Sequence, residues 1–95
     1  MTQQQTQDDA QGPRTEIVIA DRGWVFVGRA TVADSGDVVL REAQTIRIWG
    51  TTRGLGQLAL EGPQENTVLD PCGTVLIPAR SVIARMPCAR DDGWR

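Results

Sequence analysis

Residues 46–56 (Ile-Arg-Ile-Trp-Gly-Thr-Thr-Arg-Gly-Leu-Gly) bring together an aromatic ring, two arginines and two hydroxyl groups. Side chains of a strand alternate between its two faces, so Arg47 and Trp49 would lie on the face opposite Ile46 and Ile48. If the isoleucines face the core, the guanidinium and the indole face outward. An indole stacks on flat groups and a guanidinium binds phosphate or carboxylate oxygens, so this face is suited to a flat anion.

The same segment leads into a predicted helix over residues 52–61, whose apolar positions have helical spacing: Leu55, Leu58 and Ala59. Thr51 or Thr52 is placed to cap this helix, and the unpaired amide groups of a helix start favour anions. Arg53 would oppose the helix dipole unless an anion lay nearby. We therefore predict a ligand-binding site of six residues: Arg47, Trp49, Gly50, Thr51, Thr52 and Arg53.

A structural role for these residues is the alternative. Large aromatic side chains mostly serve packing, so Trp49 would then lie beneath the helix while Arg53 is simply hydrated.

The charge balance limits the kinds of partner. The chain has 95 residues and a net charge of −2, but residues 14–90 hold nine arginines against eight acidic residues, a net charge of +1. A nearly neutral domain lacks the basic field that binds duplex nucleic acid or a membrane surface. No apolar run approaches the ~20 residues that span a bilayer, and the polar N-terminus lacks a secretory signal, so we expect a soluble intracellular protein.

Few residues suit catalysis or metal binding. The chain has no histidine and two cysteines, Cys72 and Cys88, which we expect to be reduced thiols. Acidic pairs occur in a turn, Asp34 with Asp37, and in the C-terminal tail, and such positions are typical of solvated charge. We expect no enzyme activity, no metal and no cofactor.

The pattern along the chain predicts a mainly β domain. Residues 1–13 are expected to be a disordered tail, 14–90 a single small β-barrel domain, and 91–95 a C-terminal tail whose Trp94 is either an exposed anchor or disordered. The predicted strands are 15–20, 24–33, 38–49 with a bend near Ala43–Gln44, 74–77 and 81–86. Residues 63–73 form a loop with room for a short strand at 67–69.

These elements suggest one short helix and a small, curled, antiparallel β-barrel of about five strands. Its predicted core is Ile17, Ile19, Val25, Val27, Val32, Val39, Ile46, Ile48, Leu55, Leu58, Val75, Ile77, Val82 and Ala84. Both faces of strand 24–33 are apolar at its start, so one face is a candidate for burial in an oligomer. A domain this small gains stability from assembly, and we expect a homo-oligomer.

Two stretches resemble the Sm-like barrels. Residues 25–43 are similar to the first motif of that family, and residues 74–84 are similar to the second. This resemblance implies an Sm-like barrel. The Asp-x-Asn turn and the Arg-Gly pair that hold RNA bases in the family are replaced here by residues 34–37 and 78–80, so RNA binding of that kind is not expected.

A second resemblance covers residues 16–88. The pattern Trp49-Gly50-Thr51, followed by Leu55, Leu58, Ala59 and Gly62, is similar to a widespread family of small bacteriophage proteins. The resemblance implies a non-enzymatic protein of the host-cell cytoplasm that counters bacterial CBASS immunity. It would act as a sponge, binding a cyclic nucleotide signal without cleaving it. The alternative function is a phage structural or protein-interaction module that assembles through its barrel and has no small-molecule ligand.

Overall fold

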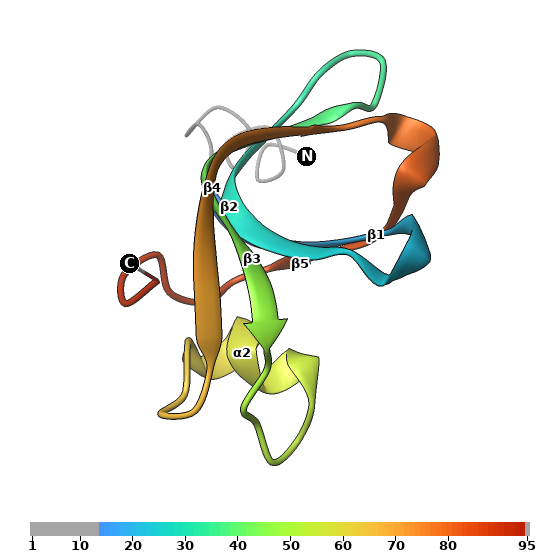
Figure 1. The fold of residues 1–95 in the computed structure, drawn as a ribbon. Coiled ribbons are helices and arrows are strands. Elements are labelled where there is room, and N and C mark those ends of the chain that lie inside the picture. The colour runs from blue at the N-terminus through green and yellow to red at the C-terminus, as the bar shows by residue number, and fades with distance from the viewer. Residues whose placement is uncertain (1–13, 95) are drawn as a thin grey trace, which may run out of the picture.

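The five strands form one antiparallel sheet in the order β4-β3-β2-β1-β5, as Figure 1 shows. The computed structural model describes residues 14–94, so the predicted tail at 1–13 lies outside the described residues. The strands are β1 (Arg14–Ala20), β2 (Val25–Val32), β3 (Val38–Ile48), β4 (Val68–Ile77) and β5 (Val82–Pro87). A helix, α2 (Leu55–Glu61), joins β3 to β4, and two 3-10 turns are η1 (Asp21–Gly23) and η2 (Ala79–Ser81). The predicted fold class is confirmed.

Tight turns join neighbouring strands where the sequence predicted them. In the β2–β3 turn, the Ala33 amide donates to the Asp37 carbonyl at 2.9 Å. The Asp37 carboxylate also accepts the Ala79 amide at 2.8 Å, which ties η2 to this turn. In η1, Arg22 adopts a left-handed conformation with φ of 62°. These contacts fix the conformation of the turns.

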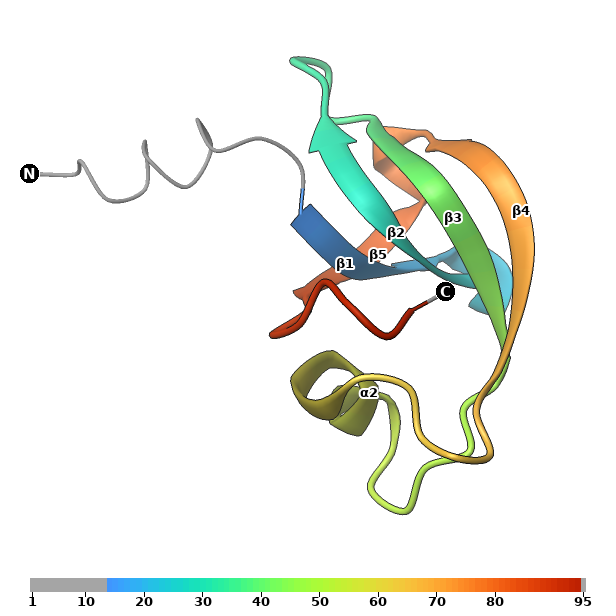
Figure 2. The same ribbon diagram turned by 90° about the vertical axis from the view of Figure 1, so that its left-hand side faces the viewer.

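The predicted bend in β3 is confirmed and explains the curl seen in Figure 2. The β3–β4 register shifts on both sides of Ala43, and Glu42 has a left-handed φ of 54°. Gly28 lies opposite on β2, where a Cβ atom would be 3.0 Å from the Arg41 carbonyl oxygen. Glycine therefore permits the close strand approach at the bulge.

β4 is longer than predicted. Residues 68–77 form one continuous strand rather than a loop with separate short strands, because β3 extends along its whole length as a partner. Pro71 and Gly73 lie within this strand, where the pairing is irregular. Proline is tolerated there because β4 is at the sheet edge.

Alternate side chains of β1 and β2 pack into two small hydrophobic cores on opposite faces of the sheet. One core packs against α2 and contains Ile17, Val25, Val27, Ile46, Leu55, Leu58, Ala59 and Trp94. The other fills the concave side and contains Val18, Ala20, Ala30, Val38, Leu40, Ala43 and Ile77. Both faces are thus largely buried within a single chain.

The predicted core needs corrections. On β3, Val38 and Leu40 are the buried residues, whereas the predicted Val39 lies between them, is only half-buried and belongs to neither core. Val32 is 42% exposed and Ile48 is 47% exposed, so neither is a core residue. The pairing of β3 with β4 shifts between Ile46 and Ile48, which takes Ile48 out of the alternation.

Trp94 is also a correction, because its side chain is only 5% exposed. The C-terminal segment carries it between the sheet and α2 (Figure 2). The Ala89 amide donates to the Ala59 carbonyl at 2.8 Å, and the Trp94 indole N–H donates to the Arg90 carbonyl at 3.2 Å. The segment therefore completes the core beneath the helix.

Two further features follow from the described residues. Cys72 and Cys88 are free thiols, and burial raises the pKa of Cys88 to about 11. Within residues 14–94, no helix is long and apolar enough to cross a membrane.

Candidate functional site

Five of the six predicted ligand residues lie in the connection between β3 and α2, and Arg47 is the second-last residue of β3. We call residues 47–57, which include all six, the corner. Trp49 follows the end of β3 and is 41% exposed. Its carbonyl accepts the Thr67 hydroxyl at 2.7 Å. The indole is therefore at the surface, and the backbone beneath it is fixed by the loop before β4.

Gly50 shapes the corner through its backbone. It has a left-handed φ of 65°, and a Cβ atom there would lie 2.3 Å from the Asn66 carbonyl carbon. A side chain at this position would collide with backbone. Gly50 therefore belongs to the framework of the corner.

The helix begins at Leu55, three residues later than predicted, and Gly54 occupies the N-cap with a φ of 88°. Neither threonine is the N-cap residue, although the Thr51 hydroxyl accepts the Gly54 amide at 3.0 Å. The two glycines near the helix start, Gly54 and Gly56, weaken the predicted first turn. Residues 52–54 form a loop instead.

Gln57 holds this loop in place. Its side-chain oxygen accepts the amide groups of Thr52 at 3.0 Å and Arg53 at 2.8 Å. Its side-chain nitrogen donates to Gln64 at 3.2 Å. Gln57 is only 9% exposed, so a buried side chain already occupies the amide groups predicted to bind an anion. Sequence reasoning missed this residue, whose signal was a polar side chain among the buried positions of the helix.

Both predicted arginines of the site have acidic partners. Arg47 pairs with Asp70 on β4 at 2.7 Å, and this contact raises the pKa of the guanidinium. Arg53 pairs with Glu61 at the end of α2. All four side chains are about half exposed or more, so water screens the pairs and an incoming anion would compete with carboxylates for the arginines.

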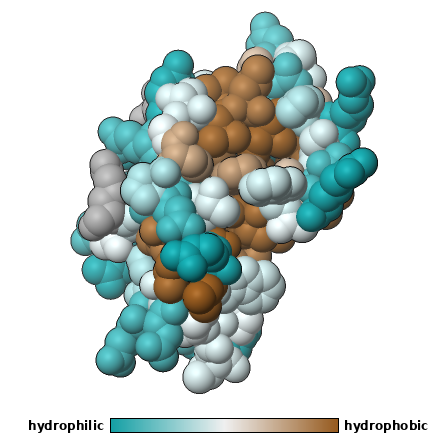
Figure 3. Space-filling model, in the orientation of Figure 1, coloured by the Kyte–Doolittle hydropathy of each residue, from teal (hydrophilic) through white to brown (hydrophobic). Residues whose placement is uncertain are grey.

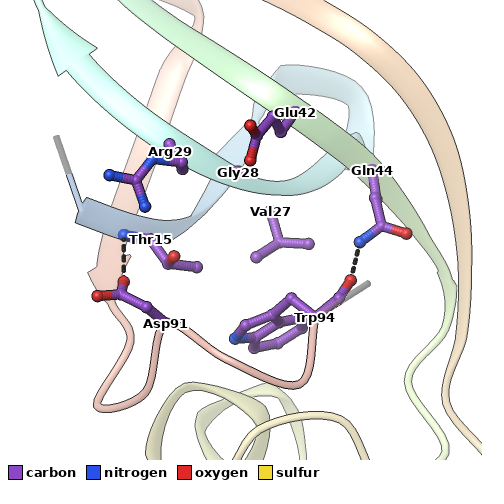
Figure 4. Close-up of a pocket in the computed structure, with 8 residues that line it drawn as sticks. All are labelled: Thr15, Val27, Gly28, Arg29, Glu42, Gln44, Asp91 and Trp94. Atoms are coloured by element: carbon purple, nitrogen blue, oxygen red, sulfur yellow. Dashed lines mark hydrogen bonds between the residues drawn. The ribbon is translucent and has the colours of Figure 1, made fainter.

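The hollow in Figure 4 is closed by the C-terminal segment. The Gln44 side chain donates to the Trp94 carbonyl, and the Asp91 carboxylate accepts the Thr15 amide at 3.1 Å. The hydrogen bonds with Thr15 hold the pKa of Asp91 below its usual value. The contacts secure the segment against the sheet. Within residues 14–94, no group of three or more His, Cys, Asp or Glu residues is placed to hold a metal ion.

The two edges of the sheet differ from the corner and the C-terminal segment, whose polar groups have partners within the chain. Among the described strands, β4 and β5 each have a neighbour on one side only. Leu76 on β4 is 63% exposed and Ile83 on β5 is 66% exposed. Unpaired strand edges with aliphatic side chains are suited to pairing with another chain.

Comparison with known proteins identifies the architecture. No protein-family model and no curated protein sequence matches the chain. The SmAP1 heptamer of P. aerophilum matches with 18% identity and a TM-score of 0.56, over 95% of this chain and 97% of that one. A heptameric archaeal Sm protein matches with 18% identity and a TM-score of 0.53, over 87% and 96%.

The Sm protein of Pyrococcus abyssii, solved in complex with a uridine heptamer, matches with 21% identity and a TM-score of 0.54, over 86% of this chain and 94% of that one. The likeness extends over nearly the whole length of each of these structures. The chain therefore has an Sm-like fold.

Proposed function

We propose that this protein is a non-enzymatic subunit of a homo-oligomer that assembles through the two free edges of its sheet. The observation that carries this proposal is the pair of unpartnered edge strands, β4 and β5, each with a strongly exposed aliphatic residue. Monomeric proteins usually protect such edges with charge, proline or a bulge.

Protection is present on only part of each edge. The first half of β4 contains Asp70 and Pro71 and is irregular as far as Gly73. The second half, up to Ile77, pairs regularly with β3 and leaves Leu76 exposed. On β5, Arg85 forms an ion pair with Glu16 on the neighbouring strand β1 at 2.8 Å. Its charge is therefore directed to β1 and does not protect the β5 edge.

The two edges differ, so a contact between them is head-to-tail. Such contacts form closed rings when the rotation between copies closes. Two of the similar structures are described as heptamers, which supports a ring for this chain.

Light scattering over a concentration series tests the proposal. We expect the wild-type mass to exceed the 10.4 kDa of one chain. Leu76→Asp and Ile83→Asp should each reduce the mass toward that of the monomer, because a charge would be buried without a partner. Leu60→Asp is the matched control, since Leu60 is 69% exposed on α2 and belongs to neither edge strand. A wild-type monomer at all concentrations would contradict the proposal.

Sequestration of a cyclic nucleotide is the second candidate function, with the corner as its site. Trp49 is 41% exposed, and the Arg47 and Arg53 side chains are 60% and 62% exposed. A flat anion in solution can therefore reach an aromatic ring and two cationic side chains. Binding to the Thr52 and Arg53 amides requires the Gln57 oxygen to move away. The resemblance to phage proteins implies that this activity would take place in a host-cell cytoplasm.

A thermal-shift series with cyclic di- and trinucleotides tests this second function. A ligand of the folded state raises the melting temperature, and Trp49→Ala should abolish the rise. Gln57→Ala removes the competing oxygen and should increase the rise if phosphate binds the loop amides. No shift in the wild type at millimolar nucleotide would exclude the corner as a site.

A further inference from the structure

The concave core opens onto the surface between the two edge strands. Phe26, Val75 and Val82 are only partly buried where they pack against this core. Figure 3 shows an apolar patch in the same orientation as Figure 1, over the region that β4, η2 and β1 enclose. We call these three residues together with Trp24 the mouth.

Within the mouth, Trp24 stacks on the ring of Phe26. The two rings are parallel within 2° and their centroids are 5.9 Å apart. Trp24 is 56% exposed, which is unusual for the largest apolar side chain. The stack fixes the indole with one face against Phe26, so the cost of ordering this side chain on binding is already reduced.

The mouth is continuous with the edge of β5. The Ala20 amide donates to the Trp24 carbonyl at 2.8 Å, and Ala20 also pairs with Val82, the first residue of β5. Trp24 is therefore about two strand spacings, or ~10 Å, from the free edge. Val75 lies on β4, so the mouth reaches both strands that the proposed assembly uses.

We propose that a neighbouring copy of this chain covers the mouth, with Trp24 as the anchor of the contact. This inference rests on the assembly proposed above and extends its interface from the strand edges to the aromatic stack. Aromatic residues at the centre of an interface commonly dominate its affinity. The near-neutral charge of residues 14–90 favours such an apolar contact over recruitment of a polyanion.

Sedimentation or light scattering of full-length variants tests the anchor. We expect Trp24→Ala to raise the dissociation constant of the assembly at least about tenfold, as for a hot-spot residue, and Trp24→Phe to raise it less. Leu60→Ala removes another exposed apolar side chain, on α2, and should leave the constant unchanged. Circular dichroism melting checks that each variant is folded.

The outcomes separate the two proposals. A wild-type chain that remains monomeric overturns both. If the wild type assembles and Trp24→Ala leaves the dissociation constant unchanged, Trp24 is not the anchor, but assembly through the strand edges is still supported. An exposed indole also stacks on nucleobases, so oligouridylate is titrated in parallel; binding that requires Trp24, with assembly unaffected, overturns the anchor in favour of nucleic acid.

Discussion

The corner and the strand edges both display exposed groups, but they differ in how those groups are satisfied. In the corner, Gln57 occupies the loop amides, and Arg47 and Arg53 each have an acidic partner. At the edges, Leu76 and Ile83 are exposed on strands with one neighbour each. A region whose polar groups are internally paired needs no partner for its stability, whereas an unpaired apolar edge gains from one. The comparison therefore favours the edges as the functional surface.

Removing Trp94 should have the largest effect on the α2 side of the molecule. Trp94→Ala leaves a large cavity in the core beneath the helix, and we expect the free energy of unfolding to fall by about 3–5 kcal/mol. Chemical denaturation measures this change. Leu60→Ala, on the exposed face of the same helix, should change stability by less than about 0.5 kcal/mol. Equal effects of both substitutions would contradict the packing described for the C-terminal segment.

Substitution of Gly50 should destabilise the corner and leave the strand edges unchanged. Gly50→Ala places a methyl group against the Asn66 backbone at a positive φ, and we expect a loss of about 2–4 kcal/mol from overpacking and backbone strain. Gly56→Ala is the matched control. Its site is open and lies in α2, so alanine should be neutral or stabilise the fold by up to about 1 kcal/mol. Thermal denaturation of the pair checks the difference.

Replacing Gln57 should loosen the corner more mildly. Gln57→Met preserves the size of the side chain but leaves the Thr52 and Arg53 amides without their acceptor. Water reaches these partly buried groups, so we expect a loss of about 1–2 kcal/mol of unfolding free energy. Hydrogen exchange at the two amides should become faster in the variant. Unchanged protection would show that Gln57 does not fix the loop.

The smallest predicted effect is a dependence on pH. The Thr15 hydrogen bonds hold the pKa of Asp91 below its usual value. The resulting stabilisation is fully present above the unfolded pKa of about 3.9 and is lost as the pH falls through the lower folded value. Asp91→Asn removes the titration, so the melting temperature of the variant should fall less than that of the wild type between about pH 5 and pH 2. An identical slope in both proteins would contradict this assignment.

The sequence predicts the strands better than it predicts the corner. Alternation identifies β1 to β3 and their connecting turns, and the change of phase at Ala43–Gln44 correctly locates the bend. β4 was divided because Pro71 and Gly73 are typical loop residues. Its continuity depends on pairing with β3, a long-range contact that local propensity does not contain.

Trp94 and the helix start were missed for a different reason. Trp94 is isolated among polar residues, so it has no periodicity to mark it as buried. The start of α2 depends on the side chain of Gln57, which folds back onto the preceding loop. Both features are tertiary contacts of single residues. The outward placement of Trp49 was predicted from alternation with a buried Ile48, but Ile48 is itself 47% exposed, so the exposure of Trp49 reflects its position beyond the end of β3.

Mixing two differently blocked variants tests head-to-tail assembly most directly. Leu76→Asp blocks the β4 edge and Ile83→Asp blocks the β5 edge, so each variant retains the edge that the other lacks. We predict that each alone has the 10.4 kDa mass of one chain in light scattering and that the equimolar mixture forms a dimer of twice that mass. A mixture that remains monomeric, while the wild type assembles, would show that the two edges do not meet.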